Sequence, residues 1–313
     1  MFSIELAVPA AILGILFLYK CSDILIEGTA KTAMKFGISS LVISLTLVAY
    51  GTSTPELAIS TTAALQKIPG ISLGNVIGSN IANLLLILGI GALIRPLAVE
   101  RGILQRELMI MVAATALLFL VPLFEIIGVP SWVAGGIFLV CFAAYLSYFL
   151  RAALRERTPP PVNEFGKPQK YLLFIIAGII GVIVGAWLLV ESSVSIARFL
   201  GIPEIIIALT MVSVGTSLPE LVISSLSVYR KQSEIAIGNV IGSNIFNILL
   251  VLGISLFFVP MNATGSLVYL SILLAVSLLM IPLMYTGGKL SRFNGALMLL
   301  IYCGYIGYLF LCG

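Results

Sequence analysis

The feature that constrains this chain most is a succession of apolar segments, each long enough to cross a lipid bilayer as a helix of about 20 residues. Clusters of charged residues, proline and glycine separate ten such segments in the 313 residues. Hydrophobic residues make up 60% of the chain and charged residues 10%, which leaves too little polar surface for a soluble protein of this size. The sequence therefore predicts an all-α polytopic membrane protein. The ten segments are 4–26, 38–64, 71–94, 104–123, 131–150, 171–195, 203–229, 235–258, 266–285 and 293–312.

Lysine and arginine occur almost entirely in alternate connections between these segments. The odd-numbered connections hold fifteen of the 17, and the even-numbered ones hold only Lys67 and Arg198. Cytoplasmic loops of membrane proteins carry an excess of these residues. We therefore expect both termini to be extracellular and the long connection 151–170 to be a cytoplasmic linker. The same asymmetry supports ten spans, because a missed span would scramble it.

Rare residue types exclude several functions. The chain has no histidine, which removes His-ligated zinc or haem, Ser-His-Asp catalysis and histidine proton relays. Asp23 is the only aspartate, so an intramembrane protease with two aspartates is impossible. Four scattered cysteines show no metal-binding spacing, and a net charge of +4 is typical of basic cytoplasmic loops rather than nucleic-acid binding. We expect neither an enzyme nor a cofactor.

An internal repeat links the two halves of the chain. Residues 43–96 align without a gap with residues 207–260, at an offset of 164, and 29 of the 54 positions are identical. The offset spans five segments, an odd number, so the second copy runs through the membrane in the opposite sense. Secondary transporters use such inverted repeats and bind their substrates where the copies meet. We predict one membrane domain over 1–313, with five-helix repeats at 1–150 and 171–313.

The first repeated motif predicts a broken helix beside a buried acid. In Gly51-Thr-Ser-Thr-Pro-Glu56 and in Gly215-Thr-Ser-Leu-Pro-Glu220, the proline has no N–H and should interrupt the helix. Irregular backbone is tolerated at membrane depth only inside the protein or along a cavity. A central acid costs about 2.5–3.5 kcal/mol in the bilayer. Two such glutamates, with freed carbonyls and the hydroxyls of the motif, therefore indicate bound cations.

The second motif, GNVIGSNI, predicts a polar stripe along a helix. Asn75, Ser79 and Asn83 are spaced four residues apart and fall on one helix face, and Asn239, Ser243 and Asn247 repeat the pattern. Such a stripe either lines a site or joins helices. Glycine pairs in GxxxG spacing, at 74 and 78 and at 238 and 242, predict close helix approach. Asn80 and Asn244 point off the stripe, so we expect them to be packing residues.

These oxygen donors suit hard cations, because the motifs hold no sulfur or imidazole ligand. Two glutamates supply a charge of −2, which one Ca²⁺ or two Na⁺ would neutralise. A site that accepts either filling, but not both at once, behaves as an exchanger. A third Na⁺ on hydroxyls and carbonyls would make the exchange electrogenic. A Ca²⁺-permeable channel that uses the glutamates for selectivity is the alternative from another class.

The paired motifs resemble the α-repeats of the Ca²⁺/cation antiporter superfamily, and most closely the Na⁺/Ca²⁺ exchanger family in its compact prokaryotic form. The resemblance implies a multi-pass protein of a prokaryotic plasma membrane that moves Ca²⁺ and Na⁺ by alternating access, with the first and sixth spans as a mobile pair. It implies Ca²⁺ binding by Glu56 and Glu220 with the carbonyls of Thr52 and Thr216. The implied Na⁺ sites and facing amides use Ser53, Ser79, Ser217, Ser243, the carbonyls of Ala49 and Ser213, and Asn83 and Asn247.

One position departs from part of that family. Some prokaryotic members and the K⁺-dependent exchangers carry aspartate where Asn247 stands, so asparagine argues against K⁺ dependence. The H⁺/Ca²⁺ branch typically has GNxxE in place of GTSxPE, often with histidine nearby, and this chain has neither. Na⁺/Ca²⁺ antiport is therefore the leading prediction and H⁺/Ca²⁺ antiport the second. The expected partners are the ions, with H⁺ as an alternative, and membrane lipid; the sequence names no protein partner.

Overall fold

The computed structural model describes residues 4–67, 69–99, 103–155, 168–200, 215–260, 266–285 and 288–312. Within these ranges the chain is helical apart from short connections and two strands of two residues each. The strands, β1 (Leu97–Ala98) and β2 (Lys289–Leu290), pair in antiparallel register. Each of the ten predicted segments overlaps helical residues, so the predicted all-helical class is confirmed.

In the first half of the chain, three of the predicted segments are divided into successive helical pieces. The helices are α1 (Ile4–Phe36), α2 (Ser40–Ile43), η1 (Ser44–Val48), α3 (Ala49–Thr52), α4 (Thr54–Leu65), α5 (Pro69–Ile81), η2 (Ala82–Ile87), α6 (Leu88–Ile94), α7 (Ile103–Leu117), α8 (Leu120–Ile126) and α9 (Ser131–Arg155). The second half contains α10 (Pro168–Phe199), α13 (Leu218–Tyr229), α14 (Ser233–Phe246), η4 (Asn247–Leu252), α15 (Gly253–Phe258), α16 (Leu267–Tyr285) and α17 (Arg292–Cys312).

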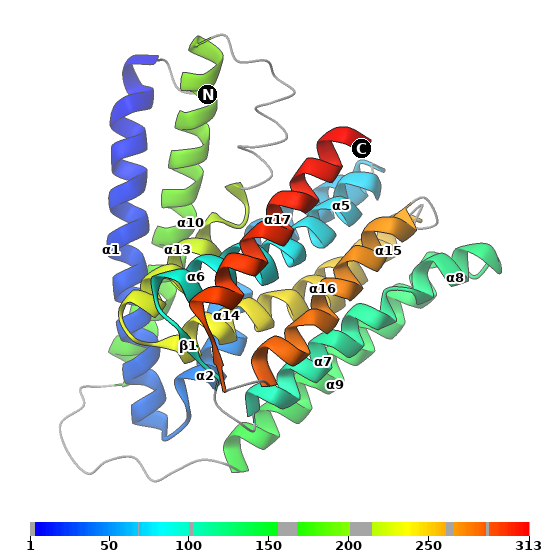
Figure 1. Ribbon diagram of the computed structural model, residues 1–313, viewed down its shortest axis with the longest axis horizontal. Helices are drawn as coiled ribbons and strands as arrows, with labels where there is room; N and C mark the ends of the chain where they lie inside the picture. The colour runs from blue at the N-terminus through cyan, green and yellow to red at the C-terminus, as the bar shows by residue number, and fades with distance from the viewer. Residues whose placement is uncertain are drawn as a thin grey trace.

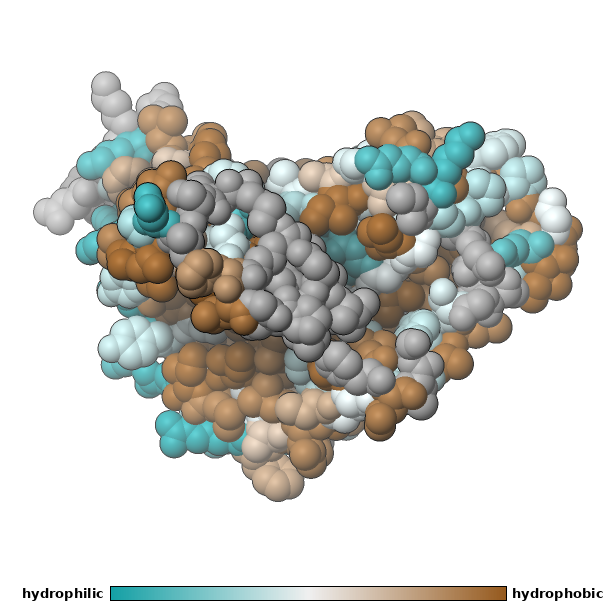
Figure 2. All heavy atoms as spheres, turned by 90° about the horizontal axis from the view of Figure 1, so that it is seen from above, coloured by the Kyte–Doolittle hydropathy of each residue, from teal (hydrophilic) through white to brown (hydrophobic). Residues whose placement is uncertain are grey.

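Several of these helices have the length and composition of membrane spans. Seven in the described ranges qualify, and a bent pair, Ser40–Thr52 with Thr54–Leu65, makes an eighth. The molecular surface is correspondingly apolar: Leu300, Val140 and Trp132 are 70%, 68% and 57% exposed, and Figure 2 shows apolar side chains over much of the visible face. A soluble protein would not expose so much apolar surface. The chain is therefore an integral, multi-pass membrane protein.

The first and sixth predicted spans form a pair of their own, α1 and α10, which stand side by side at one edge of the molecule (Figure 1). Glycines allow the two helices to approach closely; an added Cβ at Gly185 would lie 2.8 Å from the backbone nitrogen of Leu18. The first helix is ten residues longer than expected. It continues through Gly28, which is accommodated within the helix, and ends at Phe36 before Gly37, whose φ is +65°.

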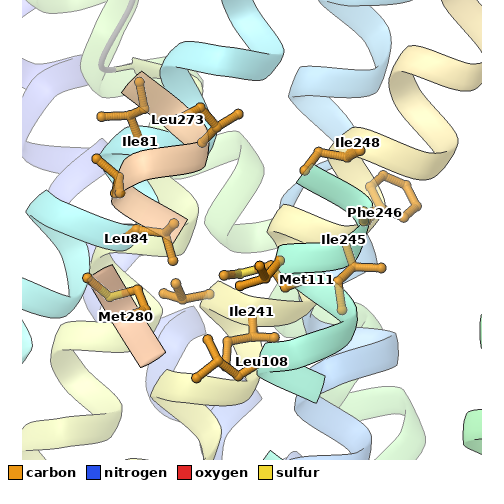
Figure 3. Close-up of a cluster of buried hydrophobic side chains, with 14 of the residues drawn as sticks. Ile81, Leu84, Leu108, Met111, Ile241, Ile245, Phe246, Ile248, Leu273 and Met280 are labelled. Atoms are coloured by element: carbon orange, nitrogen blue, oxygen red, sulfur yellow. The ribbon is translucent and has the colours of Figure 1, made fainter. Parts of the chain in front are cut away.

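The remaining helices enclose the main hydrophobic core. Figure 3 shows Leu108 and Met111 of α7 close to Ile241 of α14, with Ile81 of α5 and Leu273 of α16 in the same cluster. A second, smaller cluster joins α1 and α10 to Ile43 and Val48 of the bent helix pair and to Ile223 of α13. The α1–α10 pair therefore packs on the main bundle through a cluster that is distinct from the main core.

We expect Gly178→Ala to loosen the α1–α10 pair. The new Cβ would lie 2.7 Å from Leu25 Cβ, 2.9 Å from Leu25 Cα and 3.0 Å from the Cys21 carbonyl oxygen, where backbone cannot move aside. Overpacking of this kind costs about 1–3 kcal/mol. A lower melting temperature of the detergent-purified protein is the expected result. Gly307→Ala in α17 is the control, because an added Cβ there meets no described atom within 4 Å. Equal melting temperatures for the two variants would contradict the predicted close packing.

Candidate cation site

In the first copy of the repeat, α3 and α4 meet at Ser53. α3 ends at Thr52, Ser53 has φ −82° and ψ 10°, and the flanking helices are bent by 45°. Thr54 already belongs to α4, so this helix begins one residue before Pro55. Glu56 consequently lies in the first turn of α4. Ser217, with φ −90° and ψ 7°, precedes α13 in the same way and places Glu220 in its first turn.

The two glutamates are buried and are hydrogen-bonded by serines of the opposite copy of the repeat. Ser53 Oγ donates to Glu220 Oε1 at 2.9 Å, and Ser217 Oγ donates to Glu56 Oε1 at 3.2 Å. Glu56 is 1% exposed and Glu220 is not exposed at all. The two GTSxPE motifs, 164 residues apart in sequence, therefore meet in one buried place.

Threonine hydroxyls and a backbone carbonyl complete this region. Thr52 Oγ1 donates to the Ala49 carbonyl at 3.2 Å and also contacts Asn239 Oδ1 at 3.1 Å. Ser243 Oγ donates to the same Ala49 carbonyl at 3.4 Å. The hydroxyl of Thr216 lies beside the Glu56 carboxylate. The Ala49 carbonyl faces the second copy, but it already accepts two hydroxyls, which must turn away before it can bind an ion.

The first residues of the predicted polar stripe join helices instead of facing the glutamate side chains. Asn75 Nδ2 donates to Ser60 Oγ at 2.9 Å and to the Glu56 carbonyl at 3.3 Å. Asn239 Nδ2 donates to Ser224 Oγ at 3.1 Å. The repeated asparagines thus brace α5 against α4 and α14 against α13, directly behind the buried acids.

Asn80 and Asn244 correct an expectation, because they are not simple packing residues. Asn83 Nδ2 donates to Asn244 Oδ1 at 3.0 Å, and Asn247 Nδ2 donates to Asn80 Oδ1 at 3.1 Å. Their identity in both copies is the sequence signal that points to this role. Helix α5 continues into the π-helix η2, and helix α14 continues into the π-helix η4. No sequence pattern predicted these π-helices, which are frequent at functional sites.

Four oxygens of this region are buried and accept no hydrogen bond from any described residue: Glu56 Oε2, Glu220 Oε2, Asn83 Oδ1 and Asn247 Oδ1. Leaving a buried acceptor unsatisfied costs about 1–3 kcal/mol, and more when it is charged. Within the described ranges, no three or more His, Cys, Asp or Glu side chains lie close enough together to hold a metal ion by themselves. Carboxylate and amide oxygens without nitrogen or sulfur ligands suit a hard cation such as Ca²⁺ or Na⁺.

One predicted ligand, Ser213, lies outside the described residues. Ser79, another predicted ligand, is buried in α5. The two predicted glycine pairs have different surroundings. An added Cβ at Gly242 would lie 2.6 Å from the Leu45 carbonyl oxygen, whereas an added Cβ at Gly78 meets no described atom within 4 Å.

Several other acids form contacts of their own. Asp23 contacts Arg230 Nη2 at 2.6 Å and thereby connects α1 to the end of α13. Glu27 pairs with Lys31 one turn away, as expected for a helix surface. Glu107 is fully buried at the start of α7, and its carboxylate accepts a hydrogen bond from Arg106 Nε at 3.2 Å. Burial of Glu107 depends on neighbouring helices, so the sequence alone does not reveal it.

The chain resembles known proteins over nearly its whole length. Residues 6–151 and 170–311 match the family described as sodium/calcium exchanger protein. The sodium/calcium exchanger MaX1 of Methanosarcina acetivorans is 33% identical over 96% of this chain and 97% of its own. Inner membrane protein YrbG of Escherichia coli is 36% identical over 82% and 81%. The structure of the sodium-calcium exchanger NCX_Mj soaked with 10 mM Na⁺ and zero Ca²⁺ superposes with a TM-score of 0.83 at 34% identity, over 98% and 99% of the two chains.

Proposed function

Because this chain belongs to the sodium/calcium exchanger family, we propose that it is a secondary antiporter that exchanges Na⁺ for Ca²⁺ across a membrane by alternating access. The observation that carries the proposal is the reciprocal pairing of Ser53 with Glu220 and of Ser217 with Glu56. Each copy of the repeat contributes one acid and one hydroxyl to the same buried place. A single central site made of both copies is what an inverted-repeat transporter requires.

The proposed architecture has ten spans arranged as two inverted five-helix repeats, at 1–150 and 171–313, joined by the cytoplasmic linker 151–170. The helix interruptions at the two GTSxPE motifs bring backbone carbonyls to the site. Both termini are then extracellular, in a prokaryotic plasma membrane. The alternation of basic connections supports this orientation, because fifteen of the 17 lysines and arginines fall on one side.

In this proposal Ca²⁺ binds to Glu56 and Glu220 with the carbonyls of Thr52 and Thr216. The unpaired oxygens Glu56 Oε2, Glu220 Oε2, Asn83 Oδ1 and Asn247 Oδ1 support a central position for the ion. Na⁺ uses the same glutamates with hydroxyls and carbonyls around them, so that the two cations compete. The residues proposed for Na⁺ are Ser53, Ser79, Ser217, Ser243, Ala49 and Ser213.

Access to the site alternates, in this proposal, by movement of α1 and α10 past the other helices. The second hydrophobic cluster supports this movement, because the pair contacts the bundle through that cluster and can shift there while the main core stays intact. The Asp23–Arg230 contact, with both side chains partly exposed, links the pair to the main bundle in the present arrangement. Such an exposed contact is weak enough to break during each cycle.

The coupling ion is tested with purified protein in liposomes. We expect uptake of radioactive Ca²⁺ into liposomes loaded with Na⁺ and none into liposomes loaded with K⁺. Uptake driven equally by a pH gradient without Na⁺ would favour H⁺/Ca²⁺ exchange and contradict the proposal. Uptake down a Ca²⁺ gradient with no counter-ion would indicate a channel instead.

The proposed third Na⁺ makes a separate prediction about membrane potential. Three Na⁺ leaving for each Ca²⁺ entering removes one positive charge from the liposome per cycle. An inside-positive potential, set by valinomycin and external K⁺, should therefore accelerate Ca²⁺ uptake, and an inside-negative potential should slow it. Rates that do not respond to either potential would indicate two Na⁺ per Ca²⁺.

A further inference from the structure

Four buried asparagines lie together where the GNVIGSNI stretches of the two copies meet. They form two repeat-equivalent pairs, Asn80 with Asn244 and Asn83 with Asn247, and none is more than 1% exposed. An asparagine amide has an oxygen that accepts and a nitrogen that donates, and the two ends are nearly identical in shape. What fixes the direction of each amide is therefore the chemistry of its partners.

Backbone carbonyls fix the direction of the first pair. Asn80 Nδ2 donates to the Asn244 carbonyl at 3.3 Å, and Asn244 Nδ2 donates to the Asn80 carbonyl at 3.4 Å. A backbone carbonyl only accepts, so it must face the nitrogen of each amide. The amide oxygens of Asn80 and Asn244 are consequently turned away from these carbonyls.

Those oxygens in turn fix the direction of the second pair. Asn244 Oδ1 receives Asn83 Nδ2 at 3.0 Å, and Asn80 Oδ1 receives Asn247 Nδ2 at 3.1 Å. An amide oxygen can receive only the nitrogen end of the next amide. Asn83 and Asn247 must therefore direct their own oxygens elsewhere, and these are the two amide oxygens without a described hydrogen-bond partner.

The second pair also lies close to the helices that carry the acids. Asn83 is in η2, which packs against α13, the helix of Glu220; Asn247 opens η4, which packs against α4, the helix of Glu56. Ser243, one turn before Asn247, donates to the Ala49 carbonyl beside the site. An amide oxygen at this place attracts a cation, whereas an amide nitrogen with its two hydrogens repels it.

We infer that Asn80 and Asn244 are positioning residues that make Asn247 and Asn83 present oxygen, not nitrogen, to the transported cation. The inference rests on the proposed function. Each positioning residue belongs to the copy opposite the amide that it orients, so both copies are needed to set both ligands. Without this relay, either amide is free to rotate its nitrogen toward the site and weaken ion binding.

The test is a double-mutant cycle on the full-length protein, with Ca²⁺ affinity measured by calorimetry in Na⁺-free detergent solution. Asn80→Leu removes the acceptor that holds Asn247, and we expect Ca²⁺ affinity to fall about tenfold. Aspartate at 247 has two equivalent oxygens, so its orientation no longer matters. In the Asn247→Asp background, Asn80→Leu should therefore change affinity less than about twofold. A purely structural role would give the same loss in both backgrounds, which would overturn the inference.

Asn80→Asp provides a second variant, which remains informative if leucine at this buried position prevents folding. A buried, protonated carboxyl accepts the Asn247 nitrogen through one oxygen and donates its O–H to the Asn244 carbonyl, so we expect Ca²⁺ affinity no weaker than about threefold below the unmodified protein. A tenfold loss in Asn80→Asp would contradict the relay. If the unmodified protein binds no Ca²⁺ at all, the proposed function itself fails and this inference fails with it. Normal binding combined with equal losses in both backgrounds overturns the relay alone.

Discussion

Replacing either buried glutamate by glutamine will abolish Ca²⁺ transport. Glu56→Gln and Glu220→Gln each remove one of the two negative charges that compensate the ion, and the remaining charge of −1 cannot neutralise Ca²⁺. We expect Na⁺-driven Ca²⁺ uptake to fall at least about 100-fold in each variant. Folding should be preserved, because glutamine retains the oxygen that accepts Ser217 Oγ in one case and Ser53 Oγ in the other.

The same variants will be more stable than the unmodified protein when no ion is present. Two carboxylates buried together are costly when ionised, and neutralising one of them removes part of this cost. At alkaline pH and without Ca²⁺ or Na⁺, we expect melting temperatures a few degrees higher. Added Ca²⁺ should then stabilise only the unmodified protein, because only that protein binds it.

Glu5→Gln is the matched control for both measurements. It makes the same chemical change on an exposed side chain in the first turn of α1. Transport and Ca²⁺-induced stabilisation should remain at the level of the unmodified protein. Normal uptake in Glu56→Gln or Glu220→Gln would remove these residues from the proposed site.

Gly242→Ala is expected to have the second largest effect, because it pushes the two copies of the repeat apart. The added Cβ would lie 2.6 Å from the Leu45 carbonyl oxygen and 2.7 Å from Ala49 Cβ, and a backbone carbonyl cannot rotate away as a side chain can. α14 must then move away from η1 and α3. This movement breaks the hydrogen bond from the adjacent Ser243 to the Ala49 carbonyl.

We expect Gly242→Ala to cost about 1–3 kcal/mol of stability and to lower Na⁺-driven Ca²⁺ uptake more than tenfold. Thermal unfolding in detergent and uptake into Na⁺-loaded liposomes measure the two effects. Gly136→Ala on α9 is the control, because an added Cβ there meets no described atom within 4 Å. If Gly242→Ala transports as well as Gly136→Ala, the contact between α14 and η1 does not control the site.

Several parts of the fold and the site could be predicted from sequence because they depend on local chemistry. Proline has no N–H wherever it occurs, so an irregularity near Ser53 followed from Pro55 alone. Ten apolar segments followed from length and hydropathy, and each overlaps helical residues. The repeat predicted that Glu56 and Glu220 are equivalent, although no pattern stated which groups they would contact.

Contacts between distant segments were the part that sequence reasoning missed. Asn80 and Asn244 were assigned to packing because a single helix places them off the polar stripe, and only the neighbouring copy shows their role. Asp23 likewise contacts Arg230, which is 207 residues away in sequence. Periodicity describes one helix at a time and carries no information about which helix lies opposite.

The sequence by itself determined the all-helical membrane class, the repeat, the pair of glutamates and the oxygen-only chemistry, because hydropathy, identity and ligand type are properties of residues. Tertiary structure alone decided that Ser53 contacts the acid of the other copy, that Ala49 presents its carbonyl to Ser243, and that two amides leave their oxygens unpaired. The physical reason is that a hydrogen bond depends on the distance and direction between two groups. Those are set only when the two copies pack against each other.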